Sequence, residues 1–192
     1  MSIKQFNATY LAPDDRLLFR FNTLEDTEFR FWLTRRVTLF ILAATSHLIV
    51  KNLEQTHSPE AAKAIADFEK EAVQVSKAGA GVEGQDTSND QYQPGGKYPL
   101  GADPLLVMDV KCTLEKQGLE DLLSMDLVLP GGANINLKLA GPSLQAMCVL
   151  LNQLREHASW GEVPQVVDVA ISGSNAETDA PKANKPLCTN NS

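Results

Sequence analysis

Two adjacent arginines are the residues of this chain whose type and position point most directly to chemistry. Arg35 and Arg36 follow Thr34, whose hydroxyl is placed to cap a helix. Cations in the first turn oppose the helix dipole, which favours an anion there by about 0.3–1 kcal/mol. The pair could therefore hold a phosphate, a nucleic-acid backbone or an acidic peptide. We favour a structural role, because arginine forks commonly form ion pairs; the partners would be carboxylates such as Asp14 or Asp15, or those of another subunit.

A second group of charged and aromatic side chains precedes this pair on a predicted hairpin. Arg20, Arg30 and Trp32 occupy alternating strand positions and are expected to share one face. The candidate residues for binding an anion or a partner are therefore Arg20, Arg30, Trp32, Arg35 and Arg36. Nucleic acid is one ligand class for such a surface, with Trp32 stacking on a base and Arg16 adding a contact. If another element covers this face, the surface is not available.

The remaining reactive side chains are too scattered to form a predicted catalytic or metal site. The three histidines, His47, His57 and His157, lie in or beside three different predicted helices. Cys112 and Cys148 fall on apolar faces, as core cysteines do, and Cys188 lies in the tail. Zinc-ligand spacing, nucleophile elbows and phosphate-binding glycine loops are all missing from the sequence. We therefore expect no catalytic residue, no metal and no cofactor, and a protein that is not an enzyme.

The charge of the chain is negative and unevenly distributed. The 192 residues carry a net charge of −7. Residues 1–53 have seven Lys and Arg against five Asp and Glu, whereas residues 54–103 have four against nine. An acidic chain is not typical of proteins that bind nucleic acid by bulk charge. A local basic surface in the N-terminal third is still compatible with this distribution.

Cysteine usage and hydropathy favour a cytoplasmic protein. Three widely spaced cysteines do not indicate a disulfide framework. The first residues lack the apolar core of a secretion signal. The most apolar run, Val37–Val50, is about 14 residues long, whereas a membrane-spanning helix needs about 20. We therefore expect this run to be a buried helix and expect no membrane partner.

Residues 4–53 are predicted to form three strands and a helix. A strand around Phe6–Tyr10 is followed by the hairpin Leu17–Trp32 and by a helix that includes Val37. One face of the hairpin should be buried against this helix. Its predicted members are Leu17, Phe19, Phe21, Phe29, Phe31 and Leu33, packed on Phe40, Ile41 and Ala44.

Residues 104–158 repeat the pattern of three strands and a helix. The spacing from Leu17 to Val37 is 20 residues, and that from Leu123 to Leu144 is 21. Between the two units, Ser58, Pro59 and Glu60 start a helix whose apolar stripe is predicted to be Ala61, Ile65, Phe68, Ala72 and Val75. Residues 77–103 are predicted to be a flexible connection or a surface loop. Val163–Ile171 could add a weak strand or a packed segment, and residues 172–192 are predicted to be disordered.

The predicted fold class is α+β, built from two βββα units that form a possible internal pseudo-repeat. Antiparallel sheets pack on helices, and one amphipathic helix is inserted. The predicted boundaries are residues 1–76, 77–103, 104–161 and 162–192. The units either pack against each other with pseudo-twofold symmetry or form one continuous sheet covered by helices.

The residues around the arginine pair also carry a resemblance. The runs Asp15–Arg20 and Glu28–Arg36 resemble a group of small bacterial proteins of unknown function that share a hairpin ending in Trp-Leu-Thr-Arg-Arg. This resemblance implies no activity. From the residues we predict an interaction or assembly protein that forms homo-oligomers, because the first helix has more apolar surface than its own unit can cover. The alternative is an accessory factor that binds nucleic acid through the arginines.

Overall fold

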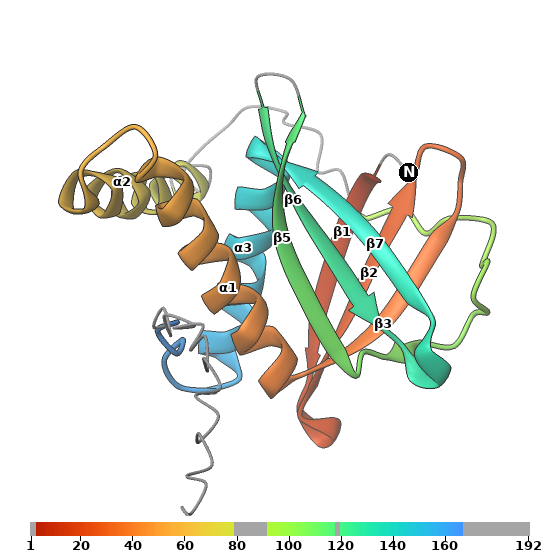
Figure 1. The fold of residues 1–192 in the computed structure, drawn as a ribbon. Coiled ribbons are helices and arrows are strands. Elements are labelled where there is room, and N and C mark those ends of the chain that lie inside the picture. Colours follow the sequence, from red (N-terminus) through yellow and green to blue (C-terminus); the bar gives the residue numbers. More distant parts are fainter. Residues whose placement is uncertain (1–2, 79–91, 118–119, 167–192) are drawn as a thin grey trace, which may run out of the picture.

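Two β-sheets and two helices enclose a shared core in the computed structural model of this chain (Figure 1). The structure describes residues 3–78, 92–117 and 120–166. In these ranges the fold is mixed α+β, with three α-helices packed against an antiparallel-rich sheet of four strands and an antiparallel sheet of three. Neither sheet closes on itself. The predicted fold class is confirmed.

The first sheet is built around the predicted hairpin. Its strand order is β1 (Ile3–Leu11), β2 (Arg16–Thr23), β3 (Glu28–Thr34) and β4 (Leu105–Leu106), and β4 runs parallel to β3. A 3-10 turn at Ala12–Asp14 joins β1 to β2. Phe19 pairs with Phe31 and Phe21 with Phe29, so that the aromatic residues share one buried face. The predicted hairpin and its inner face are confirmed.

Helix α1 (Arg35–Leu53) continues directly from β3. The hydroxyl of Thr34 accepts a hydrogen bond from the backbone N–H of Val37 at 3.3 Å, which confirms the predicted cap. By length and composition alone α1 could cross a membrane, but several of its apolar residues are buried among the sheets and helices. Ile41 joins the core as predicted. Phe40 is 43% exposed, so its predicted burial is wrong.

The second unit repeats the order of three strands and a helix seen in the first unit. It contains β5 (Asp109–Gln117), β6 (Glu120–Val128) and β7 (Asn134–Ala140), all antiparallel, with the turn Pro130–Gly132 between β6 and β7. Helix α3 (Gly141–His157) follows β7 as α1 follows β3. Leu105 and Leu106, which precede β5, pair with β3 and extend the first sheet.

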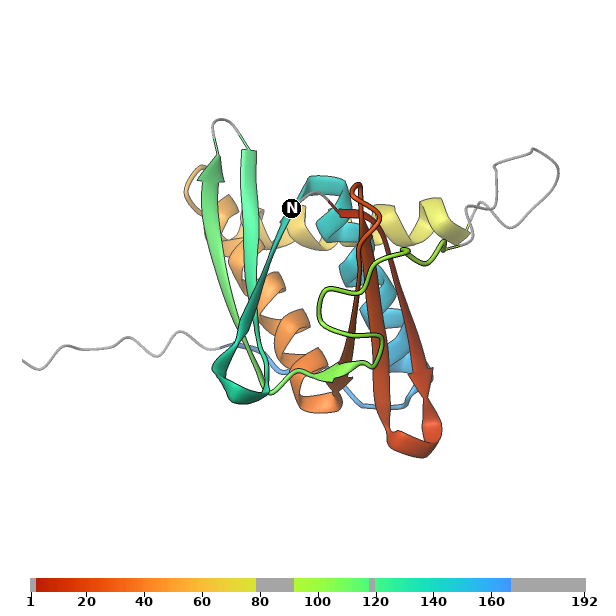
Figure 2. The same cartoon turned by 90° about the vertical axis from the view of Figure 1, so that its right-hand side faces the viewer.

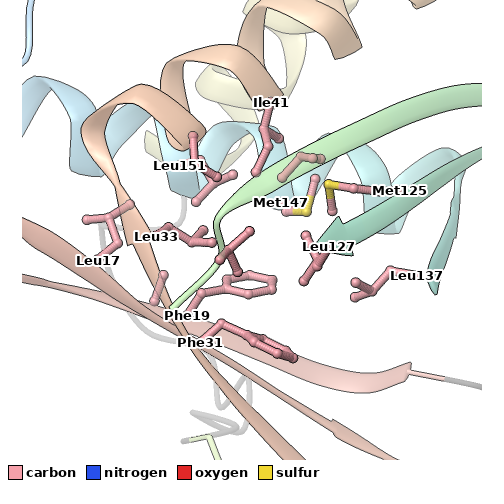
Figure 3. Packing of buried hydrophobic residues seen from close by; sticks show 14 of the residues in the cluster. Leu17, Phe19, Phe31, Leu33, Ile41, Met125, Leu127, Leu137, Met147 and Leu151 are labelled. Carbon is pink, nitrogen blue, oxygen red and sulfur yellow. The ribbon is translucent and has the colours of Figure 1, made fainter. Parts of the chain in front are cut away.

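The helix of each unit packs against the sheet of the other unit, and both units share one core. Helix α1 packs against β5 of the second unit, α3 packs against β1 of the first, and the two helices contact each other. Figure 2 shows the two sheets facing each other, with the helices behind them on one side of the molecule. Side chains from both sheets and both helices meet in a single cluster, which includes Phe31, Ile41, Leu127 and Met147 (Figure 3). The units therefore have separate sheets and a common core.

Helix α2 (Pro59–Ala78) begins at the predicted position and contacts α1 and α3. It docks through Ala62, which is fully buried, with Ile65 and Ala66 half-buried. This face is turned by about one residue from the predicted stripe. As a result Phe68, a member of that stripe, is 71% exposed.

Two other predictions fall at the limits of the described chain. Residues 92–107, which we call the strap, lie along β3 and include β4. The rest of the predicted connection up to residue 91 lies mostly outside the described residues. After α3 the described chain continues to Val166 without a strand, and the predicted disordered tail lies outside it.

Candidate functional site

The structure divides the five candidate binding residues between two places. Arg20, Arg30 and Trp32 are half-buried on the outer face of the first sheet, opposite the aromatic core. Arg35 and Arg36 are exposed at the start of α1. The strap contacts the arginines on the outer face of the first sheet. The five candidate residues therefore do not form one open surface.

The strap is attached to the edge of β3 by backbone hydrogen bonds. The N–H of Glu28 donates to the carbonyl of Lys97 at 2.8 Å, and the N–H of Lys97 donates to the carbonyl of Asp26 at 3.0 Å. Farther along, the N–H of Val107 donates to the carbonyl of Trp32 at 3.0 Å. These bonds satisfy backbone groups that a free edge strand would present to solvent.

Arg30 uses its whole guanidinium group in contacts with β3 and the strap. Nε donates to Oε1 of Glu28 at 2.7 Å, Nη2 to the Tyr98 hydroxyl at 3.2 Å and Nη1 to the Ala102 carbonyl at 3.1 Å. The same group stacks on the Tyr98 ring, 4.6 Å from its centroid. The hydrogen bond with Glu28 raises the pKa of Arg30. These contacts use all three guanidinium nitrogens and three of the five N–H donors, so few donors are left for an anion.

Arg20 is held by a hydrogen bond to β1 and by an aromatic ring at the beginning of the strap. Nη2 donates to Oδ1 of Asn7 at 2.8 Å, and the guanidinium lies 4.8 Å from the centroid of the Tyr92 ring. Burial, together with the charge of Glu28, raises the pKa of the Tyr92 hydroxyl to about 12. Tyr92 therefore stays neutral at physiological pH, and its ring serves as a packing surface for the arginine.

Glu28 is the buried centre of this arrangement. Its side chain is fully buried; Oε1 pairs with Arg30 and Oε2 accepts a hydrogen bond from the N–H of Gly95 at 2.8 Å. A Cβ at Gly95 would lie 2.9 Å from the backbone carbon of Thr27, so only glycine lets the strap approach this closely. The Arg30–Glu28 pair joins two residues of β3 that are two positions apart and therefore lie on the same face of the sheet. The roles of Gly95, Tyr92 and Tyr98 were not predicted, because nothing local in the sequence marks them.

The pair at the start of α1 has a different environment. Arg36 donates from Nη2 to the carbonyl of Met108 at 2.6 Å. Among residues 3–78, 92–117 and 120–166, no carboxylate pairs with Arg35 or Arg36. Asp15, one of the expected partners, instead accepts hydrogen bonds from the indole of Trp160 at 2.6 Å and from the hydroxyl of Tyr10 at 3.0 Å. The predicted intrachain pairing with Asp15 is wrong.

The largest exposed apolar side chain of the described chain lies on α2. Phe68 is 71% exposed and is flanked on the same side of the helix by three exposed alanines. We call this set the outer stripe; it consists of Ala61, Ala64, Phe68 and Ala72. It lies beside the face that docks through Ala62, so α2 has a second apolar face that no part of the chain described by the structure covers.

Reactive side chains in the described ranges do not converge on a catalytic site. Burial raises the pKa of the Cys112 thiol to about 11, so this group is not a nucleophile near neutral pH. No group of three His, Cys, Asp or Glu residues in the described chain is arranged to hold a metal ion. A shallow hollow of about 90 Å³ lies at the β2–β3 turn. It is lined by Lys4, Asn22, Thr23, Leu24, Asp26, Gln93 and Pro94.

The candidate functional surface is therefore the helical side of the molecule, formed by the start of α1 and the outer stripe of α2. Comparison with protein-family models, with curated proteins and with solved structures found no match to this chain.

Proposed function

We propose that this chain is a non-enzymatic assembly protein that self-associates through α1 and α2. The observation that carries the proposal is the exposure of Phe68 within the outer stripe. Burying a phenylalanine side chain is favourable by roughly 1.5–3 kcal/mol, so an exposed phenylalanine in an apolar stripe favours contact with a partner. The alanines beside it add to the argument, because small side chains let another element approach the helix closely.

The exposed Phe40 on α1 adds further support. It lies in the first half of α1, where Val37, Ile41 and Leu42 are buried, and it is 43% exposed. A single exposed apolar residue is common on protein surfaces and needs no explanation. Two exposed phenylalanines on helices that contact each other are better explained by a shared interface.

The contacts of the arginines in the fold support nucleic-acid binding less well than the sequence alone does. Arg30 donates to the strap, whereas Arg20 donates to Asn7 of β1 and stacks on the Tyr92 ring of the strap. The residues left of the original surface are Arg16, Trp32, Arg35 and Arg36. Affinity for nucleic acid depends on the number of cations that contact phosphates. We therefore expect no binding of short DNA or RNA in a fluorescence-anisotropy titration, even at low salt.

The proposal is tested by measuring molar mass over a range of protein concentrations. Light scattering after size exclusion should give a mass above the 20.9 kDa of one chain, and this mass should rise with concentration. Phe68→Ser should weaken association at least about tenfold, because each copy loses an apolar contact.

The matched control is Leu24→Ser. Leu24 is 69% exposed, close to the 71% of Phe68, but it lies in the turn between β2 and β3. This variant should associate like the wild type. A wild-type mass of 20.9 kDa at every concentration would rule out self-association. Equal loss in both variants would show that the stripe has no special role.

A further inference from the structure

Two helices on the helical side of the molecule carry exposed apolar side chains that are bordered by opposite charges, the outer stripe on α2 and Phe40 on α1. On α2, the outer stripe around Phe68 is bordered by the exposed carboxylates of Asp67 and Glu71. On α1, the exposed Arg36 lies one turn before Phe40 on the same face. Charges at the border of an apolar face decide which partner fits it, because like charges are repelled and opposite charges attract.

The acidic border of α2 follows from the spacing of its residues. Glu60, Asp67 and Glu71 are separated by seven and four positions, so they lie along one side of the helix. All three are exposed. Lys63, which is also exposed, lies farther round the helix from Phe68 than these carboxylates do. A second copy that docked with the same α2 face would bring acidic borders together, so a basic face fits better.

The start of α1 supplies a basic face. Arg35 and Arg36 lie where the helix dipole disfavours cations, and no carboxylate pairs with them in the described part of the chain. Asp15, the nearest candidate by sequence reasoning, is occupied by Trp160 and Tyr10. Carboxylates from another molecule would relieve the unfavourable position of both arginines.

We propose that the outer stripe of α2 is covered by the start of α1 from a second copy of this chain. Phe40 of one copy packs on the stripe of the other, and Arg35 and Arg36 face the acidic border. Both helices lie on the same side of the molecule, so that a twofold axis makes the contact twice and closes the dimer (Figure 1). This inference rests on the proposed self-association and adds the identity and orientation of the partner.

Two charge-reversal variants of the full chain test the pairing. Arg35→Glu with Arg36→Glu gives the first variant. Acids at this position agree with the helix dipole, which offsets the loss of the Arg36 hydrogen bond to the Met108 carbonyl, and circular dichroism checks that the variant is folded. Asp67→Lys with Glu71→Lys gives the second variant, with Glu60 retained because it is in the first turn of α2. Each variant alone presents like charges at both contacts of the dimer and should associate on the order of 100-fold more weakly than the wild type.

An equimolar mixture of the two variants is the decisive sample. In a mixed dimer, one contact joins the introduced glutamates to the introduced lysines and the other joins native arginines to native carboxylates. Both contacts are then complementary, so the mixture should recover the wild-type molar mass in sedimentation velocity. Controls with the same changes in net charge are Lys97→Glu with Lys111→Glu and Glu25→Lys with Asp103→Lys, all at exposed positions of the sheet side. They should associate like the wild type.

The outcomes separate this inference from the proposed function. If the wild type associates but the charge variants do so equally well, or their mixture gains nothing over each variant alone, the α1–α2 pairing is wrong and self-association stands. If the wild type is a monomer throughout, both proposals fall. Association of the wild type, loss in each variant and recovery in the mixture support the pairing.

Discussion

Two pairs of arginines from one stretch of the chain, residues 20–36, have opposite environments. The first pair is Arg20 and Arg30, and the second is Arg35 and Arg36. The first two are enclosed by the strap, where tyrosine rings and Glu28 take up their guanidinium groups. The second two are exposed, and within the described residues only the side chain of Arg36 makes a hydrogen bond, to the carbonyl of Met108. The strand alternation that places an arginine on the outer face does not decide whether that face is open. A distant segment decides it.

The largest loss of stability is expected from a substitution on the inward face of the same hairpin. Phe31 is fully buried between the two sheets (Figure 3). Phe31→Ala should lower the free energy of unfolding by about 3–5 kcal/mol, because it leaves a large cavity. Denaturant unfolding measures this directly, and a loss below about 1 kcal/mol would show that Phe31 is not part of the core.

The contribution of the enclosed arginines to stability should depend on Glu28. Glu28→Gln keeps the shape of the side chain but removes the charge that pairs with Arg30. We expect a loss of roughly 1.5–3 kcal/mol in the free energy of unfolding, the usual contribution of a hydrogen bond to a charged group. Because the Glu28 side chain is fully buried, solvent cannot replace the lost interaction. An unchanged unfolding midpoint would mean that the strap is not held by this pair.

The close approach of the strap can be tested with two neighbouring glycines. Gly95→Ala would place a Cβ 2.9 Å from backbone and should cost about 1–3 kcal/mol. Gly96→Ala would meet the end of the Asp26 side chain, which can move aside, and should cost less. Thermal unfolding of the two variants compares them. Equal losses would indicate a general effect of glycine replacement rather than contact with β3.

Alkaline pH should loosen the strap through Tyr92. The pKa of Tyr92 is raised to about 12 in the folded protein, above its ordinary value of 10.0. Its contribution to stability is therefore complete below pH 10 and is lost as pH rises toward 12. Tyr92→Phe cannot ionise, so the difference in unfolding midpoint between wild type and variant should change between pH 9 and pH 11. A constant difference would contradict the assignment.

The smallest effect on stability is expected at the exposed arginines. Arg35→Gln with Arg36→Gln removes two cations that oppose the dipole of α1, and with them the hydrogen bond from Arg36 to the Met108 carbonyl. These effects oppose each other, so the stability of the monomer should change by less than about 1 kcal/mol. Thermal unfolding at a concentration where the protein is monomeric makes this measurement. The matched change, Arg20→Gln with Arg30→Gln, should be destabilising. If both double variants lose stability equally, the contrast between the two pairs disappears.

The sequence predicted those parts of the fold that depend on local pattern. The alternation of Leu17, Phe19 and Phe21 determines the inner face, and Thr34 determines where α1 begins. The repeat of three strands and a helix was also recognisable, because each hairpin leads directly into its helix. These features depend on neighbours within a few residues, which the sequence displays.

The parts that could not be predicted depend on contacts between distant segments. Asn22 binds the carbonyl of Gln93, 71 residues away, and Arg30 binds that of Ala102. A strap rich in polar and glycine residues looks like a loop until the sheet that holds it is known. The face of α2 was misjudged because this alanine-rich helix has two apolar faces, and only the packing of Ala62 shows which one docks.

The measurement that tests the account most directly is the molar mass of the wild type and of Phe68→Ser across a wide range of concentrations. We predict a wild-type mass that rises from 20.9 kDa toward twice that value, and a variant that remains at 20.9 kDa over concentrations where the wild type is a dimer. A wild type that stays at 20.9 kDa throughout, or a variant that dimerises as readily as the wild type, would contradict the account.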